Sequence, residues 1–117
     1  MTNYTEPITA IEPIDAGVYI KLAGEIDLSR SPALRQQLLE MARQRPGRLV
    51  VDLGDVPYMD SSGVATLVET LQQQRKGGGR MVLCCLQPKV RSIFEIARLE
   101  MIFTIVEDKQ AALADTP

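Results

Sequence analysis

Short apolar runs alternate with amphipathic segments along most of the chain. The runs at residues 8–14 and 18–23 have the length and composition of β-strands, and Asp15-Ala16-Gly17 between them predicts a hairpin turn. Three later apolar runs predict three further strands, at residues 48–53, 80–86 and 103–106. The hydrophobic pattern therefore predicts five strands, of which the first two are joined by a hairpin.

The first predicted helix follows the second strand. Its inner face is formed by four apolar residues at i, i+4, i+7 and i+8: Leu34, Leu38, Met41 and Ala42. Ser31 is the predicted N-cap, because Pro32 after it suits the first helical position. Pro46-Gly47 is expected to end the segment.

Three more helices are predicted in the rest of the chain. The second carries Val64, Leu67, Val68 and Leu71 on one face and ends at the glycines at 77–79. The third begins at Gln87-Pro88, and its expected inner face consists of Val90, Ile93, Phe94 and Ala97. A short helix at residues 109–114 closes the chain.

This order of elements predicts an α/β fold. Strands separated by helices favour parallel pairing through right-handed crossovers, whereas the hairpin makes the first strand antiparallel to the second. We expect one domain over residues 1–117, with its core at about residues 8–113. It contains a mixed, mostly parallel sheet of about five strands and about four helices.

Composition narrows the functional classes. The 117 residues are 45% hydrophobic and 24% charged, with a net charge of -2, as in one folded domain. No basic cluster suggests nucleic acid as a direct partner. No apolar run is long enough for membrane insertion, and the N-terminal residues lack the features of a signal peptide, so we expect a cytoplasmic protein.

Catalytic and metal chemistry have few candidate residues. The chain contains no histidine, which excludes a Ser-His-Asp triad and a histidine-liganded zinc site within it. Its two cysteines, Cys84 and Cys85, are adjacent on a predicted strand and would point to opposite faces, so a disulfide between them is unfavourable. We interpret them as small buried hydrophobic residues and expect neither a metal nor a cofactor.

The polar segment Asp60-Ser61-Ser62-Gly63 stands where the third strand gives way to the second helix. Asp and Ser are typical N-caps, and Gly permits close approach of backbone to backbone, so a helix cap alone would explain the segment. A phosphoryl group on a serine here would instead meet unpaired N–H groups and the positive end of the helix dipole. Asp27 would lie nearby if the loop after the second strand closes over the same end of the sheet.

Three stretches carry a resemblance to a known family. They are Leu22–Asp27, residues 50–53 running into Tyr58–Gly63, and Gly79–Leu83 followed by Pro88–Val90. In order and spacing the sequence resembles a STAS domain of the bacterial anti-sigma factor antagonist type, from about Ile8 to Leu113. The segment at residues 60–63 is the most specific of the three, and the glycine triplet is longer than the family pattern requires.

The resemblance implies a switchable binding module and not an enzyme. Its partner would be an ATP-binding anti-sigma factor that is also a serine kinase. The unphosphorylated antagonist would bind it and release the sigma factor, and phosphorylation at Ser61 would abolish binding until a PP2C-type phosphatase restores it. The resemblance assigns Asp27, Asp60, Ser62 and Gly63 to the same partner-binding surface, with Ser62 as a cap or minor acceptor. The choice of Ser61 over Ser62 rests on the resemblance.

Two other classes of function remain as alternatives. An enzyme with Ser61 as nucleophile would need Lys76 or Lys89 as its base, because no histidine is available. A non-phosphorylated STAS subunit of a membrane-associated lipid-trafficking or transport complex is the stronger alternative, although such subunits often lack a serine at the position of Ser61.

Overall fold

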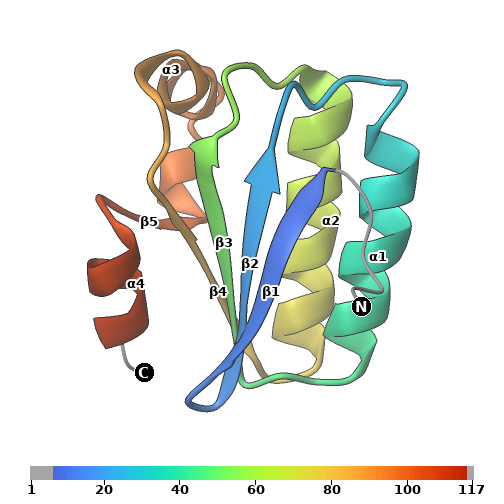
Figure 1. The fold of residues 1–117 in the computed structure, drawn as a ribbon, viewed down its shortest axis with the longest axis vertical. Coiled ribbons are helices and arrows are strands. Elements are labelled where there is room, and N and C mark those ends of the chain that lie inside the picture. The colour runs from blue at the N-terminus through green and yellow to red at the C-terminus, as the bar shows by residue number, and fades with distance from the viewer. Residues whose placement is uncertain (1–6, 116–117) are drawn as a thin grey trace.

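A five-stranded mixed sheet forms the centre of the protein, whose computed structural model describes residues 7–115 (Figure 1). The strand order is β1-β2-β3-β4-β5; β1 pairs antiparallel with β2, and every later pair is parallel. The strands are β1 (Ile8–Ile14), β2 (Gly17–Ala23), β3 (Arg48–Asp55), β4 (Arg80–Cys84) and β5 (Thr104–Val106). The mostly parallel sheet with an antiparallel first strand is confirmed.

Helices cover both faces of this sheet. They are α1 (Ser31–Arg43), α2 (Ser61–Lys76), α3 (Pro88–Ile96) and α4 (Lys109–Ala114), with a 3-10 turn, η1, at Leu99–Met101. Figure 1 shows α1 and α2 side by side on one face, while α4 lies on the opposite face. None of the helices within residues 7–115 is long and apolar enough to cross a membrane.

The core has two parts because the sheet is buried on both faces. The larger part lies between the sheet and the helices α1, α2 and α3, and it includes Leu38, Leu67 and Phe94, all with 0% exposure. The smaller part lies beneath α4 and consists of Tyr19, Val50, Val82, Cys84 and Ala112. The apolar β3 run fits this position, since its alternate side chains reach opposite core parts.

The end of one predicted strand and the face of one predicted helix differ from the structure. β4 ends at Cys84 and not at residue 86, because Cys85 takes a positive φ of 67° that leaves the extended conformation. On α3, Val90 and Phe94 are buried as predicted, whereas Ile93 is half-buried and Ala97 is exposed. Ala97 is the C-cap residue, so the helix ends before this position could turn inward.

The predicted N-cap of α1 is wrong. The helix begins at Ser31 itself, and the residue in the N-cap position is Arg30, whose side chain makes no capping hydrogen bond. Ser31 is instead buried, and its hydroxyl donates to the hydroxyl oxygen of Ser62 at 2.8 Å. The Ser31 side chain, which the sequence pattern assigned to a local cap, therefore contacts α2 instead.

Candidate functional site

The segment Asp60-Ser61-Ser62-Gly63 begins α2, as the sequence predicted. Asp60 is the N-cap, and its Oδ1 accepts from the amides of Ser62 at 2.9 Å and Gly63 at 3.2 Å. These hydrogen bonds satisfy two of the N–H groups that a helix start leaves unpaired. The cap interpretation of the segment is therefore correct as far as Asp60 is concerned.

The loop between β2 and α1 lies directly beside this helix start. Ile26 and Met59 form a parallel bridge, in which the Ile26 amide donates to Tyr58 O at 3.0 Å and the Asp60 amide donates to Ile26 O at 3.1 Å. The second carboxylate oxygen of Asp60 accepts from the Leu28 amide at 3.1 Å. One side chain thus joins the two loops, and the structure brings the Asp27 loop to the end of the sheet where we expected it.

Gly63 allows the two loops to approach each other. It is buried, and a Cβ at this position would lie 2.5 Å from Met59 Cγ and 2.9 Å from Ile26 Cγ2. Contacts that short require a neighbour to move, so only glycine fits without rearrangement. The expected close approach at Gly63 is present.

The two serines have different environments. The Ser62 hydroxyl donates to Asp60 Oδ1 at 2.5 Å and accepts from Ser31, so both its donor and its acceptor capacity are in use. Ser61 is exposed, and its hydroxyl makes no hydrogen bond with any side chain or backbone group in residues 7–115. The Ser61 side chain faces solvent, while Val64 and Val68, which the sequence pattern placed on one face of this helix, are both half-buried.

Two carboxylates lie at this end of the sheet, Asp60 directly before Ser61 and Asp27 in the adjoining loop, and both favour the ionised form. The pKa of Asp60 lies below its usual value, chiefly because the Ser62 hydroxyl donates to the carboxylate. The pKa of Asp27 is also lowered, chiefly by the hydroxyl of Ser29, which donates to Oδ1 at 2.6 Å. The charge of Asp60 acts in the opposite direction and raises the pKa of Asp27.

Two exposed apolar side chains border the site and were not singled out from the sequence. Leu28 is 73% exposed and follows Asp27; Tyr58 is 38% exposed and precedes Met59 in the strand-to-helix loop. The Lys89 ammonium lies 5.9 Å from the centre of the Tyr58 ring, at a cation–π distance. Large apolar residues that face solvent beside polar groups are typical of binding surfaces. Both residues lie in loops between elements, where no periodic pattern marks them in the sequence.

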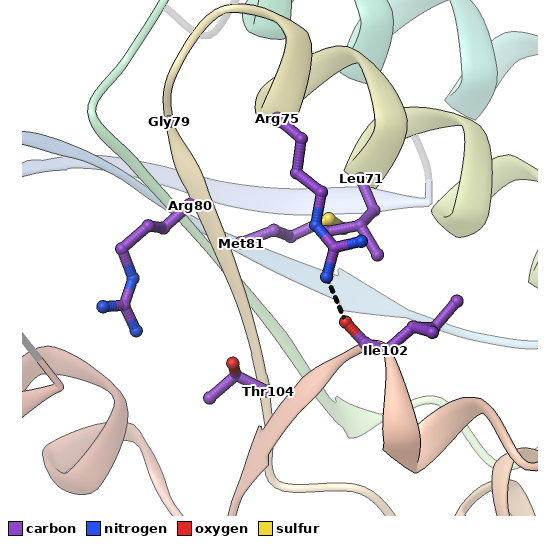
Figure 2. Close-up of a pocket in the computed structure, with 7 residues that line it drawn as sticks. All are labelled: Leu71, Arg75, Gly79, Arg80, Met81, Ile102 and Thr104. Carbon is purple, nitrogen blue, oxygen red and sulfur yellow. Dashed lines mark hydrogen bonds between the residues drawn. The ribbon is translucent and has the colours of Figure 1, made fainter. Parts of the chain in front are cut away.

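A groove between α1 and α2 continues from the site. It has a volume of about 280 Å³ and is lined near the site by Ser31, Ser62 and Thr66. Its far end is bordered by Arg35 and Glu69, which form a bidentate ion pair with N–O distances of 2.7 and 2.5 Å. A second hollow, of about 210 Å³, lies at the opposite end of α2, where Arg75 donates to Ile102 O at 2.7 Å (Figure 2). It includes none of the residues 60–63.

The site offers binding groups more readily than catalytic ones. Within residues 7–115 no basic side chain is hydrogen-bonded to Ser61, and the candidate base Lys89 instead lies over Tyr58. Nucleophilic serine chemistry requires a base within hydrogen-bond reach. The geometry therefore supports a recognition surface built around an exposed hydroxyl.

Comparisons with known proteins agree on one family. The model of the STAS domain family matches residues 8–112. The anti-sigma-B factor antagonist of Bacillus subtilis is 36% identical over 88 residues, which cover 75% of this chain and 80% of the relative. The crystal structure of an anti-sigma factor antagonist from Mycobacterium paratuberculosis superposes with a TM-score of 0.82 at 28% identity and covers 91% of each chain.

The same fold occurs in SpoIIAA of Bacillus, an anti-sigma factor antagonist that has been solved both unphosphorylated and phosphorylated. Both structures superpose with a TM-score of 0.68, at 20% and 22% identity, and each covers 87% of this chain. They cover 90% and 94% of SpoIIAA respectively. At this identity the likeness concerns the fold.

Proposed function

This chain belongs to the STAS domain family and, within it, to the anti-sigma factor antagonists, and from that premise we propose that it is a binding protein switched by phosphorylation of Ser61. The unphosphorylated form binds an anti-sigma factor that is a serine kinase and thereby releases a sigma factor. Phosphorylated protein is released and is restored by a PP2C-type phosphatase. The domain catalyses no reaction of its own.

The different environments of the two serines carry this proposal. A kinase must reach the acceptor oxygen from solvent, and the exposed Ser61 hydroxyl offers it without breaking an internal hydrogen bond. Transfer to Ser62 would disrupt its bonds to Asp60 and Ser31, the second of which joins α2 to α1. Ser61 is therefore the acceptor, and Ser62 serves the architecture of the helix start.

Repulsion between negative charges explains how the phosphate would act. A phosphoserine adds a charge of about -1.5 to -2 next to two carboxylates that are already ionised. The amides of Ser62 and Gly63 are occupied by Asp60, so they are not available to hold the phosphate against the helix. We had expected free N–H groups to receive it. The phosphate would instead remain on the binding surface.

The change in partner affinity expected from one phosphate is large enough to switch binding on and off. Moving a complex from 99% to 1% bound requires about a 10⁴-fold change in affinity, or roughly 5.5 kcal/mol. Burying an ionised phosphate in an interface without compensating donors costs several kcal/mol, and the nearby carboxylates of Asp27 and Asp60 supply no donor. A change of fold is not required.

Mass spectrometry of the protein isolated from its own cells, growing and stressed, tests the proposal. We expect one phosphoryl group on the peptide that contains Ser61, with an occupancy that differs between the two conditions. Absence of phosphate under every condition would refute the switch and favour the alternative of a STAS subunit in a membrane-associated complex.

Variants of the two serines then distinguish an effect of charge on binding from an effect on stability. Ser61→Ala should bind the serine-kinase partner constitutively, and Ser61→Asp should bind it weakly, as measured by calorimetry or surface plasmon resonance. Ser62→Ala is the matched control: it removes the neighbouring hydroxyl, and we expect lower stability with binding largely retained. Equal affinity of Ser61→Ala and Ser61→Asp would contradict the electrostatic account.

A further inference from the structure

A cluster of metal-binding side chains lies outside the site described above. The carboxylate of Asp52 and the sulfur atoms of Cys84 and Cys85 lie within 4.8 Å of one another. Asp52 and Cys84 face each other in register on the paired strands β3 and β4, and Cys85 follows at the end of β4. From the sequence we interpreted both cysteines as small buried hydrophobic residues and expected no metal, whereas the structure places them beside a carboxylate.

The turn at Cys85 makes the cluster possible. On a regular strand, Cys84 and Cys85 would point to opposite faces of the sheet. The φ of 67° at Cys85 breaks that alternation, and its sulfur therefore lies within 4.8 Å of that of Cys84. Both cysteines are free thiols.

The Asp52 carboxylate is held in place by two hydrogen bonds. The buried Tyr19 hydroxyl donates to Oδ2 at 2.5 Å, and the Gly54 amide donates to Oδ1 at 2.8 Å. Such second contacts orient the ligands of metal sites. Gly54 also leaves room for the group, since a Cβ there would lie 3.0 Å from Asp52 Oδ1 and 3.3 Å from Cys85 Cβ.

We propose that Asp52, Cys84 and Cys85 form a site for a zinc ion, with the fourth position open to water. Zn²⁺ binds thiolate sulfur at about 2.3 Å and carboxylate oxygen at about 2.0–2.2 Å, so the ligands of a tetrahedral site lie roughly 3.5–3.8 Å apart. Ligand atoms within 4.8 Å of one another need move by only about 1 Å to meet that geometry. On binding, each thiol releases its proton to solvent and coordinates as thiolate.

The burial of the three side chains is compatible with entry of an ion from solvent. Asp52 and Cys84 are buried, whereas Cys85 is half-buried and provides the route from solvent. Two thiolates and one carboxylate exceed the charge of the ion by one unit. The Lys109 ammonium lies 4.0 Å from the centre of the Tyr19 ring, on the same face of the sheet, but it forms an ion pair with Glu12 at 3.1 Å, so the excess charge stays on the site.

Cobalt provides a direct test on the full-length, reduced protein. We expect one equivalent of Co²⁺ to produce thiolate-to-cobalt charge-transfer absorption, and one equivalent of Zn²⁺ to remove it. Cys85→Ser leaves Cys84 as the one thiolate of the site and should weaken both the band and cobalt binding. Tyr19→Phe, which loses only the bond to Asp52, should weaken binding about 10–100-fold. Asp55→Asn changes an exposed carboxylate on the same strand and should bind like the wild type.

Two outcomes would overturn the zinc site. One is cobalt binding without charge-transfer absorption, which would place the ion on surface carboxylates. The other is equal affinity in Asp52→Asn and the wild type, which would remove the carboxylate from the site. If Cys85→Ser does not fold by circular dichroism, alkylation of the wild type decides: bound Zn²⁺ must slow the modification of both cysteines, and an unchanged rate refutes the proposal.

Discussion

Replacing Gly63 with alanine should destabilise the protein at the junction of the two site loops. The added Cβ would lie 2.5 Å from Met59 Cγ, 2.9 Å from Ile26 Cγ2 and 3.1 Å from Ile26 O. Met59 is 1% and Ile26 0% exposed, so neither side chain can move into solvent. Overpacking of this kind costs about 1–3 kcal/mol, and the higher helix propensity of alanine offsets at most about 1 kcal/mol. We therefore expect a net loss of about 1–2 kcal/mol.

Urea unfolding measures this loss, and Gly77→Ala is the matched control. Gly77 ends α2 with a φ of -84°, and a Cβ there would meet nothing closer than 3.5 Å. The control should unfold at the wild-type midpoint or slightly above it, while Gly63→Ala unfolds earlier with an unchanged slope. A Gly63→Ala midpoint equal to that of the wild type would show that the close approach does not constrain the loops.

The site should also loosen in the same variant. The Leu28 amide donates to Asp60 across the junction, so separating the loops exposes this amide to solvent. Hydrogen exchange of Leu28 should therefore be faster in Gly63→Ala than in Gly77→Ala, by more than the difference in global stability accounts for. Equal exchange at Leu28 after that correction would mean that the strain is relieved elsewhere.

Three further predictions concern other parts of the fold. The pKa of Asp60 is lowered from 3.8, so its ionised carboxylate stabilises the fold above about pH 4, and this stabilisation is lost as the pH falls through the folded-state pKa. Asp60→Asn cannot titrate, so its urea midpoint should fall less steeply than that of the wild type between about pH 5 and pH 2. Arg48 donates to Leu113 O at 2.8 Å, so Arg48→Met should accelerate hydrogen exchange in α4, and an unchanged rate would contradict an anchoring role. Phe94 is fully buried with its ring centre 5.5 Å from that of Phe103; Phe94→Ala should cost about 3–5 kcal/mol, and a thermal midpoint near the wild-type value would refute this packing.

Local patterns predicted the elements well because each element must bury one face. Strand residues alternate with a period of 2 and helical residues with a period of 3.6, and both periods can be read without knowing the partner element. The prediction was wrong at Ser31, where a partner element decides the outcome, and at Ala97, where the end of the helix decides it. Ser31 has the chemistry of an N-cap, but its hydroxyl donates to Ser62 on α2. Ala97 continues the spacing of Val90 and Phe94, but α3 ends before it.

The sequence by itself determined the α/β order, the antiparallel first strand and the placement of Asp60-Ser61-Ser62-Gly63 at a helix start. Those features depend on hydrophobic period, turn residues and capping chemistry, which act over a few neighbouring residues. Only the tertiary structure decided that Ser61 faces solvent while Ser62 is bound to Ser31, and that Asp52 meets both cysteines. Those relations join side chains from separate elements, and their geometry is fixed only when the elements pack together.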